Sequence, residues 1–304
     1  MLAGRLEAIA RSGQFAVTSE VVPPRSSNPD TVYLQARDLV GYADAVNVTD
    51  NPTATAHMSP VAGVAAVTRA GLEPTLQLTV RDRNRLALTA ELLGAWAVGA
   101  RNVLCLTGDP LSVGDHPDAT AVVDLAVTDL VRLAARLRSE GRLLSGAVIE
   151  EPPRFYVGVA DSPLAPSYDP GRLEAKIDAG AAFVMTQITY DLDSLVAWSE
   201  IIRARGILER AAVLVGVAPI RSAAQAKLIE RLPGVAVPPE LILRLEQAGP
   251  DAEAIGVADC VRIVDRLREV PGIAGVHVMG LGREAVVRRV IEEAELLPRP
   301  LTSS

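Results

Sequence analysis

The chain has 304 residues, of which 49% are hydrophobic and only 3% aromatic, and its formal charge is −7. So much apolar sequence excludes a disordered chain, and the only two cysteines, Cys105 and Cys260, exclude a disulfide scaffold. The acidic balance disfavours nucleic acid as a partner, and no apolar stretch is long enough for a membrane span. We therefore expect a globular, cytoplasmic protein with a large core and no signal peptide.

Short apolar segments alternate with amphipathic segments along the whole chain. The predicted strands are residues 15–22, 43–50, 74–80, 102–108, 143–149, 182–189, 211–218 and 273–280. Their near-continuous apolar character is typical of parallel strands that are buried on both faces. The clearest helical patterns between and after them are 84–100, 122–141, 191–206 and 283–297.

Eight strands with helical segments between them predict a single (β/α)8 TIM barrel, which forms one domain over residues 1–304. A doubly wound open sheet is the alternative, although no GxGxxG motif follows the first strand. In a barrel of this kind the functional groups lie at the C-terminal ends of the strands and in the loops that follow.

Polar residues stand at the ends of the first three predicted strands. Glu20 lies in an apolar strand, and burial there would suit a general acid. The alternative is a carboxylate at the rim of the barrel that pairs with Arg25. Thr49 and Asp50 end the second strand and fit turn chemistry as well as a ligand contact. The alternating charges of residues 81–84 predict a solvated turn.

The later strand ends add further candidates. Gly108 would let a ligand approach the backbone closely, and Asp109 is then expected to point into the barrel mouth. Residues 150–169 are expected to form a long loop with three aromatic rings, which is a lid, an oligomer contact or a plain surface loop. The glycines before Arg283 suit an anion contact at a helix N-terminus.

Several common chemistries find no support in the sequence. The three histidines show no metal-ligand spacing, so no metal site is expected, and neither GxSxG nor a P-loop occurs. The two lysines, Lys176 and Lys227, fall in helical segments, which disfavours a Schiff base at a strand end. The remaining carboxylates, amides and hydroxyls are suited to holding an organic cofactor that supplies the chemistry.

Six segments, in order along the chain, resemble the methylenetetrahydrofolate reductase family, most of all its short bacterial forms. They are SEVVPPR (19–25), DAVNVTDN (44–51), QLTVRDRN (77–84), LTGDP (106–110), KIDAGAAFVMTQITYD (176–191) and AELLPRP (294–300). The resemblance implies a (β/α)8 barrel that carries FAD and reduces 5,10-methylenetetrahydrofolate to 5-methyltetrahydrofolate. It also implies a tetrahydrofolate substrate, NADH or NADPH as the electron donor, and a homo-oligomer.

The same resemblance assigns roles to individual residues. Glu20 matches the general acid that helps to open the imidazolidine ring of the folate, and Asp109 matches a catalytic carboxylate near both flavin and pterin. Gln187, Asp109 and Arg283 match positions on the substrate side. The positions that match flavin contacts are Thr49, Asp50, Gln77, Thr107, Gly108, Asp109, Asp169 and Lys176.

Four positions depart from the family pattern. A histidine at the end of the third strand is Gln77, and an arginine before the Gly-Asp of the fourth strand is Thr107. An aromatic residue near the end of the fifth strand falls at Ile149 or a neighbour, and a phenylalanine after the seventh strand falls at Ser222–Ala223. These differences leave alternatives open. They are FMN in place of FAD, a flavin-independent reductase, or a flavin- and folate-binding subunit that a partner protein reduces.

Overall fold

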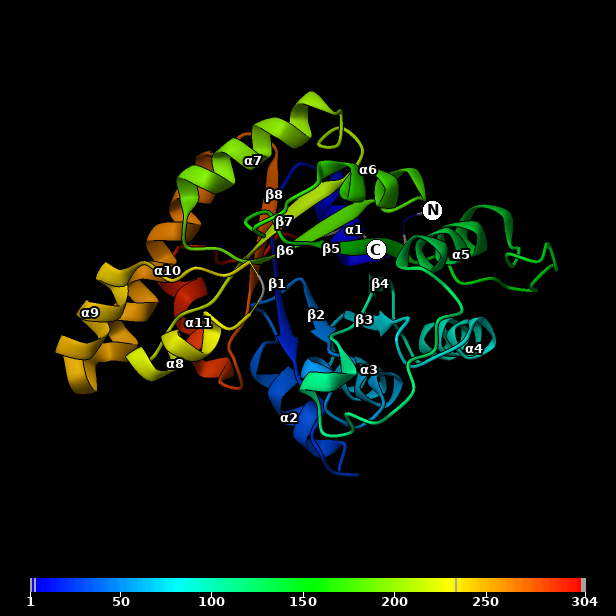
Figure 1. Cartoon of the computed structure of the whole chain (residues 1–304), viewed down its shortest axis with the longest axis horizontal. Helices are drawn as coiled ribbons and strands as arrows, with labels where there is room; N and C mark the ends of the chain where they lie inside the picture. Colours follow the sequence, from blue (N-terminus) through cyan, green and yellow to red (C-terminus); the bar gives the residue numbers. More distant parts are fainter. Residues whose placement is uncertain (1, 3, 233, 302–304) are drawn as a thin grey trace.

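The computed structural model of the chain describes residues 2, 4–232 and 234–301. Its described residues form a closed barrel of eight parallel strands in the order β1-β2-β3-β4-β5-β6-β7-β8. Figure 1 shows the helices arranged around the outside of these strands. The predicted (β/α)8 barrel is therefore confirmed, and the open doubly wound sheet is excluded.

The strands are short, as expected for a barrel of this size. They are β1 (Ala16–Val21), β2 (Ala45–Val48), β3 (Pro74–Thr79), β4 (Asn102–Leu106), β5 (Tyr156–Asp161), β6 (Phe183–Ile188), β7 (Ala212–Val217) and β8 (Ile273–Val278). The helices are α1 (Arg5–Arg11), α2 (Asp30–Asp38), α3 (Pro60–Arg69), α4 (Arg85–Ala97), α5 (Val127–Glu140), α6 (Pro170–Asp178), α7 (Leu192–Ala204), α8 (Ala223–Ile229), α9 (Pro239–Ala248), α10 (Ala252–Glu269) and α11 (Glu284–Glu293), with short 3₁₀ helices η1 (Pro52–Ala54), η2 (Leu111–Val113) and η3 (Gly249–Asp251).

Local sequence explains where the helices begin. Asn84 caps α4, because its side chain accepts a hydrogen bond from the Ala87 amide at 3.0 Å. The connection between β7 and β8 is longer than the others and holds α8, α9 and α10. Among the described residues, no helix combines the length and apolar character that a membrane crossing requires.

Closure of the barrel joins the first strand to the last. Thr18 of β1 pairs with Ala45 of β2 on one side and with His277 of β8 on the other. Side chains alternate along a strand, so Thr18 and Glu20 point to the same face of β1. The closure therefore brings Glu20 close to His277, which is 257 positions away in the sequence.

The lower part of the barrel is filled with apolar side chains. Leu6 and Ile9 of α1 are fully buried and close the N-terminal end. Above them the rings of Tyr156 and Phe183 pack with their centroids 4.8 Å apart. A cavity lined by polar side chains lies at the opposite end, where the strands finish.

The predicted fifth strand, residues 143–149, is wrong. Gly146 adopts a φ of +91°, so the segment folds back on itself, and the Leu143 amide donates to the Ala147 carbonyl at 2.9 Å. The true β5 lies within the predicted loop 150–169, whose Phe155 and Tyr156 are buried in the core and not in a lid. An apolar run that contains a glycine turn has the sequence pattern of a strand without forming one. The fifth strand therefore ends at Asp161 and not at Ile149.

Candidate functional site

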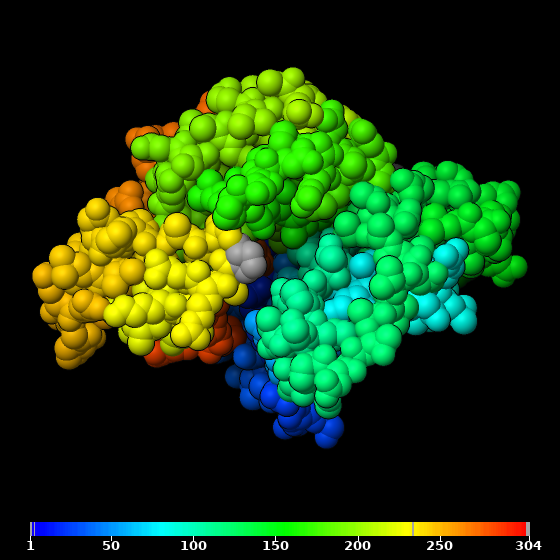
Figure 2. Space-filling view, in the orientation of Figure 1, coloured from blue at the N-terminus to red at the C-terminus, as the bar shows by residue number. Residues whose placement is uncertain are grey.

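A cavity of about 140 Å³ lies at the C-terminal ends of the strands, and we call it the mouth cavity. Figure 2 shows a hollow at the centre of this face, between the teal loop after β4, the green segment after β5 and the yellow segment after β7. Glu20, Gln77 and Gln187 line the cavity together with His277. Three residues predicted from separate strands are therefore brought together.

Glu20 faces the imidazole of His277 inside the mouth cavity. One carboxylate oxygen lies 3.6 Å from His277 Nε2, and the Glu20 side chain is 16% exposed. The other imidazole nitrogen, Nδ1, is 3.0 Å from the hydroxyl of Thr18. Arg25 pairs with Asp115 at 2.7 Å and not with Glu20, so the alternative of a rim ion pair is wrong.

Sequence reasoning missed His277 as a member of the site. In the sequence, His277 shows only that it lacks metal-ligand spacing, because its partner Glu20 lies near the other end of the chain. The signal that identifies it is the barrel itself: in a closed sheet the last strand pairs with the first. A polar residue near the end of β8 must then lie beside Glu20.

Gln187 owes its position to an irregularity in β6. The register between β6 and β7 shifts between Met185 and Ile188, which displaces the end of the strand. The Gln187 carboxamide oxygen accepts a hydrogen bond from the Ile188 amide at 2.9 Å, which leaves its amide nitrogen for a ligand. The mouth cavity is thus lined by two carboxylates, an imidazole and three side-chain amides.

A second hollow of about 510 Å³ adjoins the mouth, and we call it the outer cavity. Thr107, Asp169 and Lys176, three of the predicted flavin contacts, line it. The two cavities share the residues 160–162 at the end of β5. A single elongated ligand would pass over this shared wall to occupy both.

Lys176 and Asp169 are fixed by their own helix, α6. Asp169 caps it by accepting from the Gly171 amide at 2.9 Å. Lys176 lies in its last turn and donates to the Ala160 carbonyl at 2.7 Å. Burial lowers the pKa of the Lys176 ammonium, while the nearby Asp161 opposes that change.

Asp50 is held below the mouth by a cluster of donors. Both terminal nitrogens of Arg83 donate to its carboxylate, at 2.7 and 3.0 Å, and so do the amide and hydroxyl of Thr79. The predicted solvated turn at 81–84 is wrong, because Arg83 turns inward to this carboxylate and Arg81 is only 8% exposed. The neighbouring Thr49 hydroxyl is buried and lacks a hydrogen-bond partner among the described residues.

Like Thr49 and Asp50, three further predicted residues line neither cavity. Asp109 is exposed, and its carboxylate accepts from the Thr53 amide at 2.7 Å. Gly108 has a φ of +90°, and a Cβ there would lie 3.0 Å from that of Arg81, so the glycine makes room for this side chain. Arg283 lies 3.0 Å from Glu253 of α10, on the outer layer.

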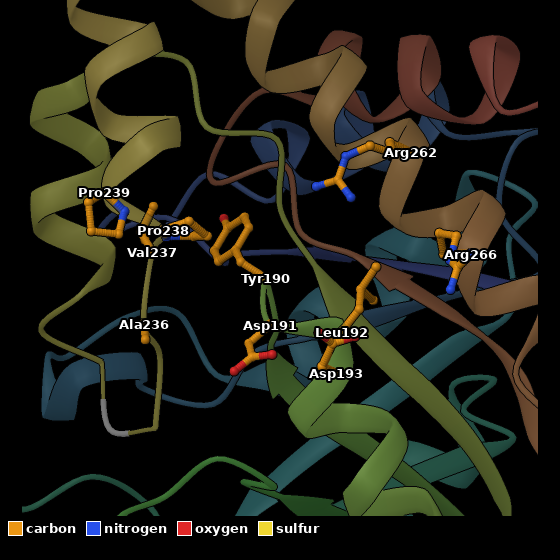
Figure 3. Close-up of a pocket in the computed structure, with 10 residues that line it drawn as sticks. All are labelled: Tyr190, Asp191, Leu192, Asp193, Ala236, Val237, Pro238, Pro239, Arg262 and Arg266. Atoms are coloured by element: carbon orange, nitrogen blue, oxygen red, sulfur yellow. The ribbon is translucent and has the colours of Figure 1, made fainter.

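A larger hollow, about 670 Å³, lies in the outer layer of the barrel. Figure 3 shows it between Arg262 and Arg266 of α10 on one side and residues 237–239 on the other. Three of its charged groups already have partners, since Arg262 pairs with Asp259 at 3.1 Å, Arg266 pairs with Glu269 at 3.6 Å and Asp191 caps α7. We therefore place the candidate site at the strand ends, where barrel chemistry occurs.

The chemistry available at the mouth is proton transfer and hydrogen bonding. Among the described residues, no group of three or more His, Cys, Asp or Glu side chains is arranged to hold a metal ion. Cys105 and Cys260 are buried, and burial raises the pKa of both thiols, so neither provides a thiolate nucleophile. A carboxylate beside an imidazole is suited to holding and delivering a proton.

Comparison with known proteins identifies relatives of the chain. A family model described as methylenetetrahydrofolate reductase matches residues 5–295. The chain is 29% identical over 236 residues to methylenetetrahydrofolate reductase 2 of Schizosaccharomyces pombe, a match that covers 74% of this chain but only 36% of the yeast protein. It is 26% identical over 282 residues to the 5,10-methylenetetrahydrofolate reductase of Salmonella typhimurium, covering 89% of this chain and 88% of that protein.

The fold also has a counterpart among solved structures. A protein from Clostridium thermocellum superposes with a TM-score of 0.63 at 11% sequence identity, over 96% of this chain and 99% of that one. It is described as an uncharacterized protein that binds two copies of 5-methyl-5,6,7,8-tetrahydrofolic acid. At this level of identity the likeness shows a shared fold.

Proposed function

Because the chain belongs to the methylenetetrahydrofolate reductase family, we propose that it reduces 5,10-methylenetetrahydrofolate to 5-methyltetrahydrofolate. In this proposal the hydride comes from a bound reduced flavin, and Glu20 is the general acid. The observation that carries the proposal is the position of Glu20, whose carboxylate lies 3.6 Å from His277 Nε2 in the mouth cavity.

Glu20 is placed to deliver the proton that this reaction needs. Opening the imidazolidine ring leaves a cationic iminium, and protonation of the departing nitrogen favours that step. Thr18 anchors the far nitrogen of the His277 ring, so the near nitrogen stays directed at Glu20. Gln77 and Gln187 offer amide groups that hydrogen bond the edge of a pterin ring.

FAD is the proposed cofactor, with FMN as the alternative. Thr107, Asp169 and Lys176 offer a hydroxyl, a carboxylate and an ammonium along the outer cavity, which fit the polar groups of a flavin. Bound there, a flavin would supply the hydride chemistry, while residues of this chain bind and orient it.

NADH or NADPH is the proposed electron donor, and one observation favours a second candidate. Among the described residues, those that line the mouth cavity include no Phe, Tyr or Trp on which a nicotinamide ring could stack. The second candidate is therefore a flavin- and folate-binding subunit that an electron-delivering partner protein reduces. A homo-oligomer is proposed for the enzyme on its own.

Stopped-flow absorbance of the flavin-loaded protein separates the two half-reactions of the Glu20→Gln variant. We expect reduction of the flavin by the donor to be unchanged and its reoxidation by 5,10-methylenetetrahydrofolate to slow by at least about a hundredfold, because an amide donates no proton to the folate. Glu240→Gln, an exposed change on α9, is the matched control and leaves both rates unchanged.

Three other outcomes of these measurements would contradict the proposal or replace it. Reoxidation of Glu20→Gln at the wild-type rate contradicts the role of Glu20 as the acid. If neither NADH nor NADPH bleaches the wild-type flavin, whereas dithionite-reduced protein reduces the folate, the partner-protein candidate replaces the first. Folate reduction with NADH by colourless protein, free of flavin, identifies a flavin-independent reductase.

A further inference from the structure

The segment that follows β7 borders the hollow at the mouth of the barrel (Figure 2). Arg221 lies on this segment, shortly after Val217, the last residue of β7. Its guanidinium donates to the carbonyl of Leu281, in the loop after β8, at 3.2 Å. That loop begins with Met279, which lines the mouth cavity. The Arg221 guanidinium therefore lies at the rim of the mouth, between the loops after β7 and β8.

The backbone around Arg221 is held in place from two sides. The Arg221 amide donates to the side-chain oxygen of Gln225 at 2.8 Å, and Ser222 caps α8 by accepting from the Gln225 amide. On the other side, α10 packs so closely that a Cβ at Gly256 would overlap the Ile220 carbonyl. The Arg221 side chain is therefore presented at a defined position.

The Arg221 guanidinium is a charge without a counter-charge. Its Nε is buried without a hydrogen-bond partner, and it forms no ion pair with any carboxylate of the described residues. A guanidinium has five N–H groups, and the hydrogen bond to Leu281 uses one of them. By contrast, Arg283 in the same loop already pairs with Glu253 at 3.0 Å. A partly buried cation of this kind is costly unless an anion supplies the missing partner.

We propose that Arg221 binds the carboxylates of the glutamate that a folate carries beyond its p-aminobenzoyl group, and so contributes to substrate specificity. The inference rests on the proposed function, in which Gln77 and Gln187 bind the pterin ring inside the mouth cavity. The p-aminobenzoyl group is a stiff spacer, so the glutamate of such a folate extends out of the cavity to its rim. A guanidinium binds a carboxylate through two parallel hydrogen bonds, which suits a side chain with several unused N–H groups.

Two ligands that differ only in the glutamate provide the test. 5-Methyltetrahydrofolate carries the glutamate, whereas the methylamide of 5-methyltetrahydropteroate keeps the p-aminobenzoyl amide and has no carboxylate. Isothermal titration calorimetry with the full-length protein measures the Kd of each. We expect the wild-type protein to bind 5-methyltetrahydrofolate at least about tenfold more tightly than the methylamide, the effect of one bidentate, charge-assisted contact.

Variants of Arg221 separate this contact from a structural role. Arg221→Met removes the charge, so it should weaken binding of 5-methyltetrahydrofolate about tenfold and leave the Kd of the methylamide unchanged. Arg221→Lys keeps the charge without the paired donors and should regain part of the loss. Arg231→Met, which changes an exposed arginine in the same connection between β7 and β8, is the matched control and should change neither Kd.

Three results overturn the inference. They are equal weakening of both ligands by Arg221→Met, a wild-type protein that binds the two ligands equally, and one that binds neither. Weaker binding of NADH or NADPH alone would assign the guanidinium to the phosphates of the donor and overturn the inference as well.

Steady-state reduction of 5,10-methylenetetrahydrofolate gives an independent readout. For Arg221→Met we expect a KM raised about tenfold with kcat unchanged, because the glutamate is remote from the reacting atoms. A lower kcat at unchanged KM contradicts a binding role. Turnover by a wild-type protein that shows no preference for the glutamate refutes this contact alone, whereas a lack of turnover with every donor refutes the proposed function.

Discussion

Asp50 and Glu20 are both carboxylates near strand ends, yet their surroundings give them different roles. Four donors from Arg83 and Thr79 surround Asp50, whose side chain is completely buried. Glu20 instead faces one imidazole and an open cavity. A carboxylate whose acceptor positions are filled by donors of the chain supports the structure, whereas one with free positions is available to contact a ligand.

Replacing Asp50 tests this distinction at the level of stability. Asp50→Asn removes the nearer counter-charge of the buried Arg83 guanidinium and leaves only Glu91 at 3.8 Å, so we expect the free energy of unfolding to fall by about 3 kcal/mol. Asp178→Asn makes the same change in an exposed pair with Arg210 and should cost less than about 1 kcal/mol. Urea unfolding of both variants measures the difference, and equal losses would contradict the structural role of Asp50.

At the scale of the elements, seven of the eight strands follow from continuous apolar runs in the sequence. The exception is instructive, because residues 143–149 and β5 have similar composition. Only the surroundings separate them: a glycine at positive φ turns the first segment back, while the second finds paired neighbours in β4 and β6. Pairing between distant segments is also what brings His277 to the site, so local patterns alone did not reveal it.

Gly158 of β5 shows how tightly the interior of the barrel is packed. A Cβ at this position would lie 2.1 Å from the Phe183 ring, so Gly158→Ala must displace a fully buried side chain. We expect a loss of about 1–3 kcal/mol in the free energy of unfolding. Gly94→Ala on α4 meets no atom within 4 Å and should stabilise the protein by about 0.5–1 kcal/mol.

Thermal unfolding compares Gly158→Ala with Gly94→Ala. A double variant that combines Gly158→Ala with Phe183→Leu tests whether the Phe183 ring causes the loss of stability. The smaller leucine gives the new methyl group space, so the double variant should regain part of the lost stability. A Gly158→Ala protein that melts at or above the wild-type temperature would show that the Phe183 ring does not constrain β5.

At the scale of the whole molecule, one buried carboxylate ties together segments far apart in the sequence. Asp44, just before β2, accepts from Arg5, from Arg299 and from the Val17 amide. Arg299 also donates to the carbonyls of Phe15 and Leu296. Figure 1 places the two chain ends near each other, in agreement with a hydrogen bond of 2.7 Å from Arg5 to the Pro300 carbonyl. This cluster holds α1 and β1 against the segment that follows α11.

Arg299→Ala tests how far the site depends on this distant closure. The change removes one of the two arginines that neutralise the buried Asp44, so we expect a loss of about 3 kcal/mol in the free energy of unfolding. Arg266→Ala, which removes an exposed arginine of α10, should cost less than about 1 kcal/mol. Hydrogen exchange should show faster exchange in β1 and β2, because the cluster joins Val17 of β1 to Asp44 just before β2. Unchanged protection of both strands, despite lower stability, would show that Glu20 and His277 are held together by the barrel pairing alone.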